Sequence, residues 1–213
     1  MKPQFVLAIF VALIAAALFS GIDQAGLRWA AGLDPKVQDV FRFVTWFGQG
    51  GVTLVPSGLI LIAAFALKPR LPQLASRLNR VIASCGLLFA AVAVAGLAND
   101  AIKVIAGRAR PRMWLNGEIS GFFGGGFSSD YQSFPSGHTA TTVAAAVVLS
   151  FLFPRGRIVF AIVALTIAVS RVIVNAHYVS DVLGGAAVGA VSAGVVIDWF
   201  RRKRWLPEPI RAA

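Results

Sequence analysis

A histidine and an aspartate four residues apart form the strongest chemical feature of the sequence. His177 and Asp181 lie in the segment 170–181 (SRVIVNAHYVSD), where polar side chains interrupt two long apolar runs. On a helix, residues at this spacing share one face, with β-carbons roughly 5 to 6 Å apart. The carboxylate could hold one ring N–H and leave the other nitrogen with a free lone pair. The spacing therefore predicts a nucleophile, His177, oriented by Asp181.

Arg171 precedes His177 by six residues, or about 240° around a helix of 3.6 residues per turn. One unbroken helix would point these two side chains in different directions. We therefore expect a helix to end between them, so that both can face one site.

Two further polar clusters precede this segment. One is KVIAGRARP at 103–111, and the other is PSGH at 135–138. The three clusters together read lysine, six residues, arginine-proline; then proline-serine-glycine-histidine; then serine-arginine, five residues, histidine, three residues, aspartate. This arrangement resembles the type 2 phosphatidic acid phosphatase family, part of a superfamily that also includes vanadium haloperoxidases. Every signature position is matched.

The resemblance implies a role for each matched residue. It makes His177 the nucleophile, Asp181 its orienting carboxylate and His138 the general acid. The implied phosphate-binding residues are Lys103, Arg110, Ser136, Gly137 and Arg171.

The residue types fit those roles on physical grounds. Phosphoryl transfer spreads negative charge over three oxygens, so catalysis depends on positioning and on fixed positive charge. Ser136 and Gly137 directly precede an apolar helix, whose first N–H groups would form an anion site. The sequence has two histidines, which is the number needed for one nucleophile and one proton donor. No cofactor is implied, and we expect no metal site, because the acidic residues near the clusters are scattered.

The spacing of the basic residues in and around the first motif does not by itself show which of them face the site. Arg108 and Arg112 flank Arg110 but match no signature position, so we expect them to be solvated or to contact lipid headgroups. Lys103 and Arg110 would share a helical face if the helix continued past Gly107. Pro111 argues against this, because a proline disfavours the helical conformation of the residue before it.

Composition indicates the setting in which these residues work. The chain has 213 residues, of which 57% are hydrophobic, above the roughly 45 to 50% of soluble domains. Mean hydropathy is +0.75. The net charge of +11 would suggest a nucleic-acid partner in a soluble protein, but here the basic residues gather between apolar runs, so we expect membrane lipids as partners and no nucleic acid. The single cysteine, Cys85, excludes a disulfide within the chain.

Six apolar runs predict an all-α integral membrane bundle of six transmembrane helices that forms a single domain over residues 1–213. Each run approaches the ~20 residues that cross a bilayer. The runs are 4–20, 48–67, 81–98, 138–153, 158–176 and 182–200. A signal peptide is the alternative for residues 4–20, but the absence of a clear Ala-x-Ala site favours a retained helix.

An additional helix is expected to lie in the membrane interface. Asp34 and Pro35 form a typical start, with an N-cap followed by proline at the first helical position. Apolar and polar residues then occupy opposite faces up to Phe47.

The distribution of basic residues predicts the orientation of the bundle. Basic connecting segments face the cytoplasm in membrane proteins, and here they are 68–80, 155–157 and 201–204. Both termini would then be cytoplasmic in the plasma (inner) membrane, with 103–134 and 171–181 on the extracytoplasmic side. Glycines 124–126, among three phenylalanines, form either a substrate lid or an ordinary loop.

Together with the family resemblance, these observations predict a metal-independent membrane phosphatase acting through a phosphohistidine. The substrate would be a lipid phosphomonoester or pyrophosphate, such as phosphatidic acid, phosphatidylglycerophosphate, undecaprenyl pyrophosphate or lipid A 1-phosphate. The sequence does not choose among these lipids or indicate an oligomeric state. The alternatives are a lipid phosphotransferase that uses the same histidine, a haloperoxidase, and a non-enzymatic lipid-phosphate binder.

Overall fold

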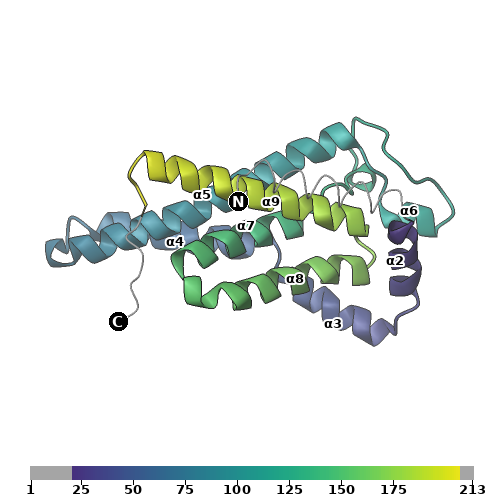
Figure 1. Ribbon diagram of the computed structural model, residues 1–213, viewed down its shortest axis with the longest axis horizontal. Helices are drawn as coiled ribbons and strands as arrows, with labels where there is room; N and C mark the ends of the chain where they lie inside the picture. Colours follow the sequence, from purple (N-terminus) through teal and green to yellow (C-terminus); the bar gives the residue numbers. More distant parts are fainter. Residues whose placement is uncertain (1–20, 207–213) are drawn as a thin grey trace.

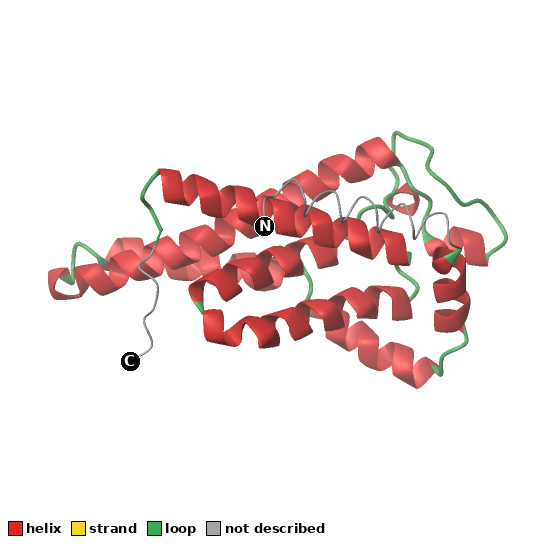
Figure 2. Cartoon of the chain, viewed as in Figure 1, coloured by secondary structure: helices red, strands yellow, loops and turns green. Residues whose placement is uncertain are grey.

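Every regular element in the computed structural model is a helix across residues 21–206, the part of the chain that the structure describes (Figures 1 and 2). Short 3₁₀ turns lie at Pro72–Leu74, Ser129–Tyr131 and Pro154–Gly156. The α-helices are α2 (Ile22–Ala31), α3 (Pro35–Trp46), α4 (Gly50–Leu67), α5 (Ala75–Ala106), α6 (Pro111–Leu115), α7 (Gly137–Leu152), α8 (Arg157–Ile173) and α9 (Val179–Arg202).

Helices α5, α7 and α9 form the centre of the bundle and contact one another, while α4 packs on α5 and α8 packs on α7 (Figure 1). Their shared core combines larger apolar residues with alanines, including Ala91, Ala95, Ala144 and Ala193. Small side chains let helices approach closely, which is the usual packing mode inside a membrane. Large apolar side chains such as Leu97 and Leu165 instead point outward, with 73% and 64% of their surface exposed.

Two glycines make the crossing of α7 and α9 especially close. A β-carbon on Gly185 would lie 2.3 Å from the carbonyl oxygen of Ser136, and one on Gly189 would lie 2.3 Å from that of Ala140. Neither position has room for a side chain. The crossing brings the start of α7 against the start of α9, where the Ser136 N–H donates to the Asp181 carbonyl over 2.9 Å.

Among residues 21–206, four helical stretches are long and apolar enough to span a membrane: Pro35–Leu67, Pro72–Ala106, Pro154–Ile173 and Val179–Arg202. Gly137–Leu152 is a shorter apolar helix. The five predicted spans that fall within residues 21–206 therefore all coincide with apolar helices. The sixth, at 4–20, lies outside the described residues, so the predicted count of six stays a prediction.

The N-terminal part of the described chain contains one predicted helix and one that was not expected. Asp34 caps α3 by accepting a hydrogen bond of 2.8 Å from the Lys36 N–H, with Pro35 at the first helical position as predicted. Helix α3 buries no residue within the protein. Helix α2, by contrast, buries Asp23, Leu27 and Ala30 against the bundle.

Candidate active site

The turn between α8 and α9 carries His177 into the site. Helix α8 ends at Ile173, as the position of Arg171 predicted. The N–H groups of Ala176 and His177 then donate to the Arg171 carbonyl over 3.1 and 3.2 Å. The chain reverses at Asn175, which has a φ of +51°.

His177 and Asp181 are close together, but they do not lie on one helix, as their four-residue spacing suggested. Helix α9 begins at Val179, so only Asp181 is helical, and it lies in the first turn. His177 Nδ1 is 3.5 Å from Asp181 Oδ2, longer than a well-formed hydrogen bond. Oδ2 accepts shorter bonds from Ser133 Oγ, at 2.5 Å, and the Tyr178 N–H, at 2.9 Å. Catalytic hydrogen bonds are often long before substrate binds.

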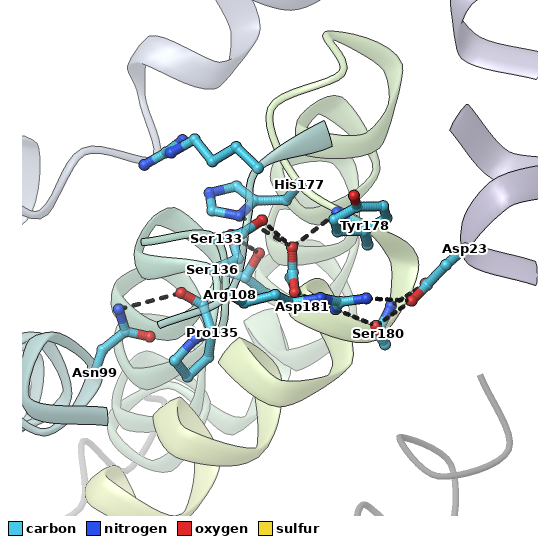
Figure 3. Close-up of polar contacts among 12 residues, drawn as sticks. Asp23, Asn99, Arg108, Ser133, Pro135, Ser136, His177, Tyr178, Ser180 and Asp181 are labelled. Atoms are coloured by element: carbon cyan, nitrogen blue, oxygen red, sulfur yellow. Dashed lines mark hydrogen bonds and ion pairs between the residues drawn. The ribbon is translucent and has the colours of Figure 1, made fainter. Parts of the chain in front are cut away.

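His177 is uncharged at neutral pH. Burial disfavours the imidazolium form and lowers the pKa of His177 to about 4, although Asp181 opposes the shift. Arg171 and Arg110 add to the lowering. With Nδ1 directed at Asp181 (Figure 3), Nε2 is the nitrogen available to attack an electrophile.

Arg171 is held by the neighbouring helix α3. Its side chain is largely buried, with 9% exposure, and its Nη1 donates to Thr45 Oγ1 over 2.7 Å. Its buried Nε has no hydrogen-bond partner among residues 21–206. An anion bound beside Arg171 would give this donor a partner.

Lys103 and Arg110 reach the site from separate elements. Helix α5 ends at Ala106, and Gly107 closes it with a φ of +56°. Lys103 Nζ lies at the start of α7, 3.6 Å from where a β-carbon on Gly137 would be. Arg110 is extended, as expected before Pro111, and its Nε donates to the Ser129 carbonyl over 2.8 Å. The shared helical face considered for this pair is therefore not present.

The start of α7 completes the site. Ser136 is the N-cap residue, and His138 is the second residue of the helix. The first N–H groups of a helix have no partner within it and favour an anion. His138 lies within electrostatic range of four other predicted site residues, namely Arg171, His177, Lys103 and Arg110. The structure thus brings the eight predicted residues together at one end of α5, α7, α8 and α9.

The expectation for Arg108 was wrong. Instead of being solvated or meeting lipid, Arg108 is 6% exposed and forms ion pairs with Asp181 and Asp23 (Figure 3). Burial by itself would lower the pKa of its guanidinium, but the two carboxylates outweigh this and raise the pKa. Arg112 is 60% exposed, as expected, and pairs with Asp130.

Three other buried residues belong to this polar network and were not predicted from the sequence: Asp23, Ser133 and Ser180. The position of Asp23 in the sequence could have indicated a buried polar contact. A carboxylate beside a long apolar run needs a partner once it is buried, although the sequence does not say which one.

The glycine-rich loop is tied to the end of α5. The Gly126 N–H donates to the Val104 carbonyl over 2.9 Å, and the Gly126 carbonyl accepts from Gln132 Nε2 over 2.8 Å. Phe127 nearby is 83% exposed. A lid function for this loop stays a prediction.

Within residues 21–206, no three His, Cys, Asp or Glu side chains cluster closely enough to hold a metal ion.

The chain belongs to the PAP2 superfamily, because its sequence matches that family over residues 84–205. The buried histidine and aspartate, with cations near the start of a helix, are consistent with this assignment. The resemblance drawn from the three motifs is confirmed.

The chain is similar to a sequence relative and to two solved structures. A lipid A 1-phosphatase of Rhizobium johnstonii is 33% identical over 156 residues, which cover 72% of this chain and 64% of that protein. The crystal structure of a transmembrane PAP2-type phosphatidylglycerolphosphate phosphatase from Bacillus subtilis has a TM-score of 0.63 at 20% identity, covering 94% of this chain and 96% of that one. The crystal structure of Aquifex aeolicus LpxE has a TM-score of 0.59 at 19% identity, covering 82% and 93%. These two structures share the fold with this chain.

Proposed function

We propose that this protein is a metal-independent membrane phosphatase that hydrolyses a lipid phosphate through a phosphohistidine. The observation that carries the proposal is the buried, uncharged His177 facing Asp181, within electrostatic range of Arg171 and Arg110. A neutral imidazole can attack phosphorus, and the cations can bind the oxygens on which charge accumulates.

The reaction would proceed in two displacements. Nε2 of His177 attacks phosphorus, and the lipid oxygen leaves with a proton from His138. Asp181 stabilises the positive charge that develops on His177. His138 then accepts a proton from water, which attacks the phosphohistidine and releases phosphate. Lys103, Arg110, Arg171 and the first N–H groups of α7 hold the phosphoryl oxygens throughout.

Lipid A 1-phosphate is the substrate we favour, because the 33% identical relative is named a lipid A 1-phosphatase. We place the site at the extracytoplasmic face, as the basic segments 68–80, 155–157 and 201–204 predict. Phosphatidic acid, phosphatidylglycerophosphate and undecaprenyl pyrophosphate carry the same reacting group and are the alternatives.

The test is phosphate release by purified protein in detergent from these four lipids, with His177→Ala as the control. We expect release from at least one lipid, highest for lipid A 1-phosphate, and none from the variant. Labelled substrate should transfer its phosphoryl group to wild-type protein as an alkali-stable, acid-labile adduct. Activity on none of the lipids, or a variant as active as wild type, would refute the proposal.

Two further measurements address the reaction type. Activity should persist in EDTA, because fixed cations supply the positive charge that a metal would otherwise bring. Loss of activity in EDTA and its recovery with a divalent cation would contradict this. Adding an acceptor lipid distinguishes a hydrolase, which releases free phosphate, from a phosphotransferase, which gives a phosphorylated acceptor.

A further inference from the structure

Arg108 joins two carboxylates from opposite ends of the chain. Its Nη1 donates to Asp181 Oδ1 over 2.5 Å and to Ser180 Oγ over 2.6 Å, and its Nη2 donates to Asp23 Oδ2 over 2.8 Å (Figure 3). The guanidinium carbon also lies 4.1 Å from the ring centre of Tyr178 and 4.9 Å from that of Phe122. Hydrogen bonds and aromatic contacts together give this side chain one orientation.

Asp23 completes the arrangement from α2. Its Oδ1 accepts the Ser180 N–H over 2.9 Å, and its Oδ2 accepts Ser180 Oγ over 2.6 Å. Asp23 therefore binds the first turn of α9 directly, as a cap supplied by a distant part of the chain. The Asp23 side chain is 3% exposed, and the Asp181 side chain is fully buried.

The two oxygens of Asp181 have different partners as a result. Oδ1 binds Arg108, whereas Oδ2 accepts from Ser133 and the Tyr178 N–H and lies nearest to His177 Nδ1. Without Arg108, the Asp181 and Asp23 carboxylates would be buried close together with no cation between them, and one of them would tend to take up a proton. A protonated Asp181 would stabilise the charge on His177 poorly.

We propose that Arg108 and Asp23 are positioning residues for the phosphatase reaction. Arg108 keeps Asp181 ionised and fixes the carboxylate so that Oδ2 faces His177. Asp23 in turn fixes Arg108 and the start of α9. The inference rests on the proposed function, since it assigns Asp181 the task of orienting a nucleophilic histidine.

Stability alone is a weak explanation for this network. Removing two carboxylates and a guanidinium from water is costly, and apolar replacements often serve folding equally well. The network lies directly against the residue proposed to orient the nucleophile, and neither Arg108 nor Asp23 is among the predicted phosphate-binding residues. Its effect should therefore appear in the chemical step and not in substrate affinity.

The first test compares Arg108→Gln, Arg108→Lys and Asp23→Asn with wild type, each assayed on whichever lipid phosphate wild type hydrolyses. We expect Arg108→Gln to lower kcat by about 10- to 100-fold, a typical coupling between contacting groups, with KM nearly unchanged. Arg108→Lys should restore part of kcat, because one ammonium keeps the charge but cannot bridge both carboxylates. The kcat of Asp23→Asn should lie between those of wild type and Arg108→Gln.

Arg112→Gln is the matched control. Arg112 lies four residues further along and also pairs with an aspartate, but that pair is exposed to solvent. Exposed pairs contribute little, so this variant should keep wild-type kcat and KM.

A double-mutant cycle with Asp181→Asn separates positioning from a structural role. If Arg108 acts through Asp181, Arg108→Gln should lower kcat by less than about threefold in the Asp181→Asn background. The same fold-loss in both backgrounds, or full activity of Arg108→Gln, would overturn the inference. Should Arg108→Gln fail to fold, as judged by thermal unfolding, the cycle with Arg108→Lys decides in the same way. A wild-type protein that hydrolyses no lipid phosphate would refute the proposed function instead.

Discussion

Two arginines of the site each bind the protein through one nitrogen of the guanidinium, which leaves other N–H groups of that guanidinium outside the contact. Arg171 binds Thr45 through Nη1, and Arg110 binds the Ser129 carbonyl through Nε. Each guanidinium retains N–H groups that are not used in these contacts. An arginine held in this way meets a phosphate with its fork already oriented.

Replacing Arg171 by lysine should therefore be harmful although the charge is kept. An ammonium can hold either Thr45 or a phosphate oxygen, but it cannot reproduce the planar fork. We expect kcat/KM to fall about 10- to 100-fold, the range corresponding to one charged hydrogen bond of roughly 1.5 to 3 kcal/mol. Steady-state kinetics check this, with the exposed Arg157→Lys at the other end of α8 as the control. Equal kinetics for the two variants would contradict it.

The pKa of His177 predicts how the first displacement depends on pH. At about 4 in the folded protein, the pKa lies below the ordinary value of 6.5, so His177 keeps its lone pair well into the acidic range. Protonation of His177 should therefore slow phosphohistidine formation only as the pH approaches 4, and not at pH 5.5. A rapid-quench measurement with labelled lipid tests this. Half-loss near pH 6.5 would mean that burial does not hold His177 neutral.

The lowered pKa of His177 also makes the stability of the folded protein depend on pH. Between pH 6.5 and 4, the unfolded chain protonates His177 while the folded protein does not, so protons favour the unfolded state. Stability from this source is fully present above pH 6.5 and decreases as the pH falls. His177→Gln should remove this part of the pH dependence when thermal unfolding is followed across the range.

The residues that sequence alone could identify are those whose roles depend on local spacing. His177, Asp181 and PSGH were predicted from positions a few residues apart. Arg108 was misassigned because its partners, Asp23 and Asp181, lie 85 and 73 residues away. Nothing in the segment GRARP distinguishes an arginine that faces a carboxylate from one that faces phosphate.

Among the helices, the crossing of α7 and α9 controls the geometry of the site. Gly185 places the Ser136 carbonyl against α9, and the Ser136 N–H binds the Asp181 carbonyl. This contact sets the distance between the anion-binding start of α7 and the aspartate that faces His177.

A methyl group at this crossing should damage both stability and activity. In Gly185→Ala, the β-carbon would lie 2.3 Å from the Ser136 carbonyl oxygen, so α7 must move. We expect the free energy of unfolding to fall by about 1 to 3 kcal/mol, as for other overpacked cores. We also expect kcat to be at least tenfold lower. Gly194→Ala on the same helix is the control, because a β-carbon there meets nothing within 4 Å. Thermal unfolding and kinetics of both variants provide the test, and equal behaviour would refute it.

Helix positions were easier to predict than helix partners. Apolar runs, Asp34-Pro35 and the reversal after Arg171 all gave correct elements, because each signal is local. Helix α2 was not expected, since Ile22–Ala31 has two charged residues and no long apolar run. Its stability comes from burying Leu27 and Ala30 against the bundle, which is a tertiary effect.

Across the whole molecule, the site and the basic segments lie at opposite ends of the long helices. Helix α5 runs from Ala75, beside Arg77 and Arg80, to Ala106, beside the site. Helix α9 runs in the other direction, from Asp181 to Arg202. By the positive-inside rule, we expect the site end to face away from the cytoplasm.

A single cysteine at Ser129 can test this orientation. In a Cys85→Ser background, Ser129→Cys should react with a membrane-impermeant thiol reagent in intact cells, because Ser129 is exposed at the site end. A cysteine at Lys203, at the opposite end, should react only in inverted vesicles. The reverse pattern would refute both the orientation and the choice of an outer-leaflet substrate.

The contact between Asp23 and Ser180 has a consequence for biosynthesis. These residues are 157 positions apart, so at ribosomal rates of roughly 5 to 20 residues per second the carboxylate waits about 8 to 30 seconds for its partner. Throughout this time the nascent chain carries an acidic group whose final environment does not yet exist. Helix α9, the last helix among residues 21–206, supplies both Ser180 and Asp181, so a chain that ends before it lacks the aspartate that faces His177.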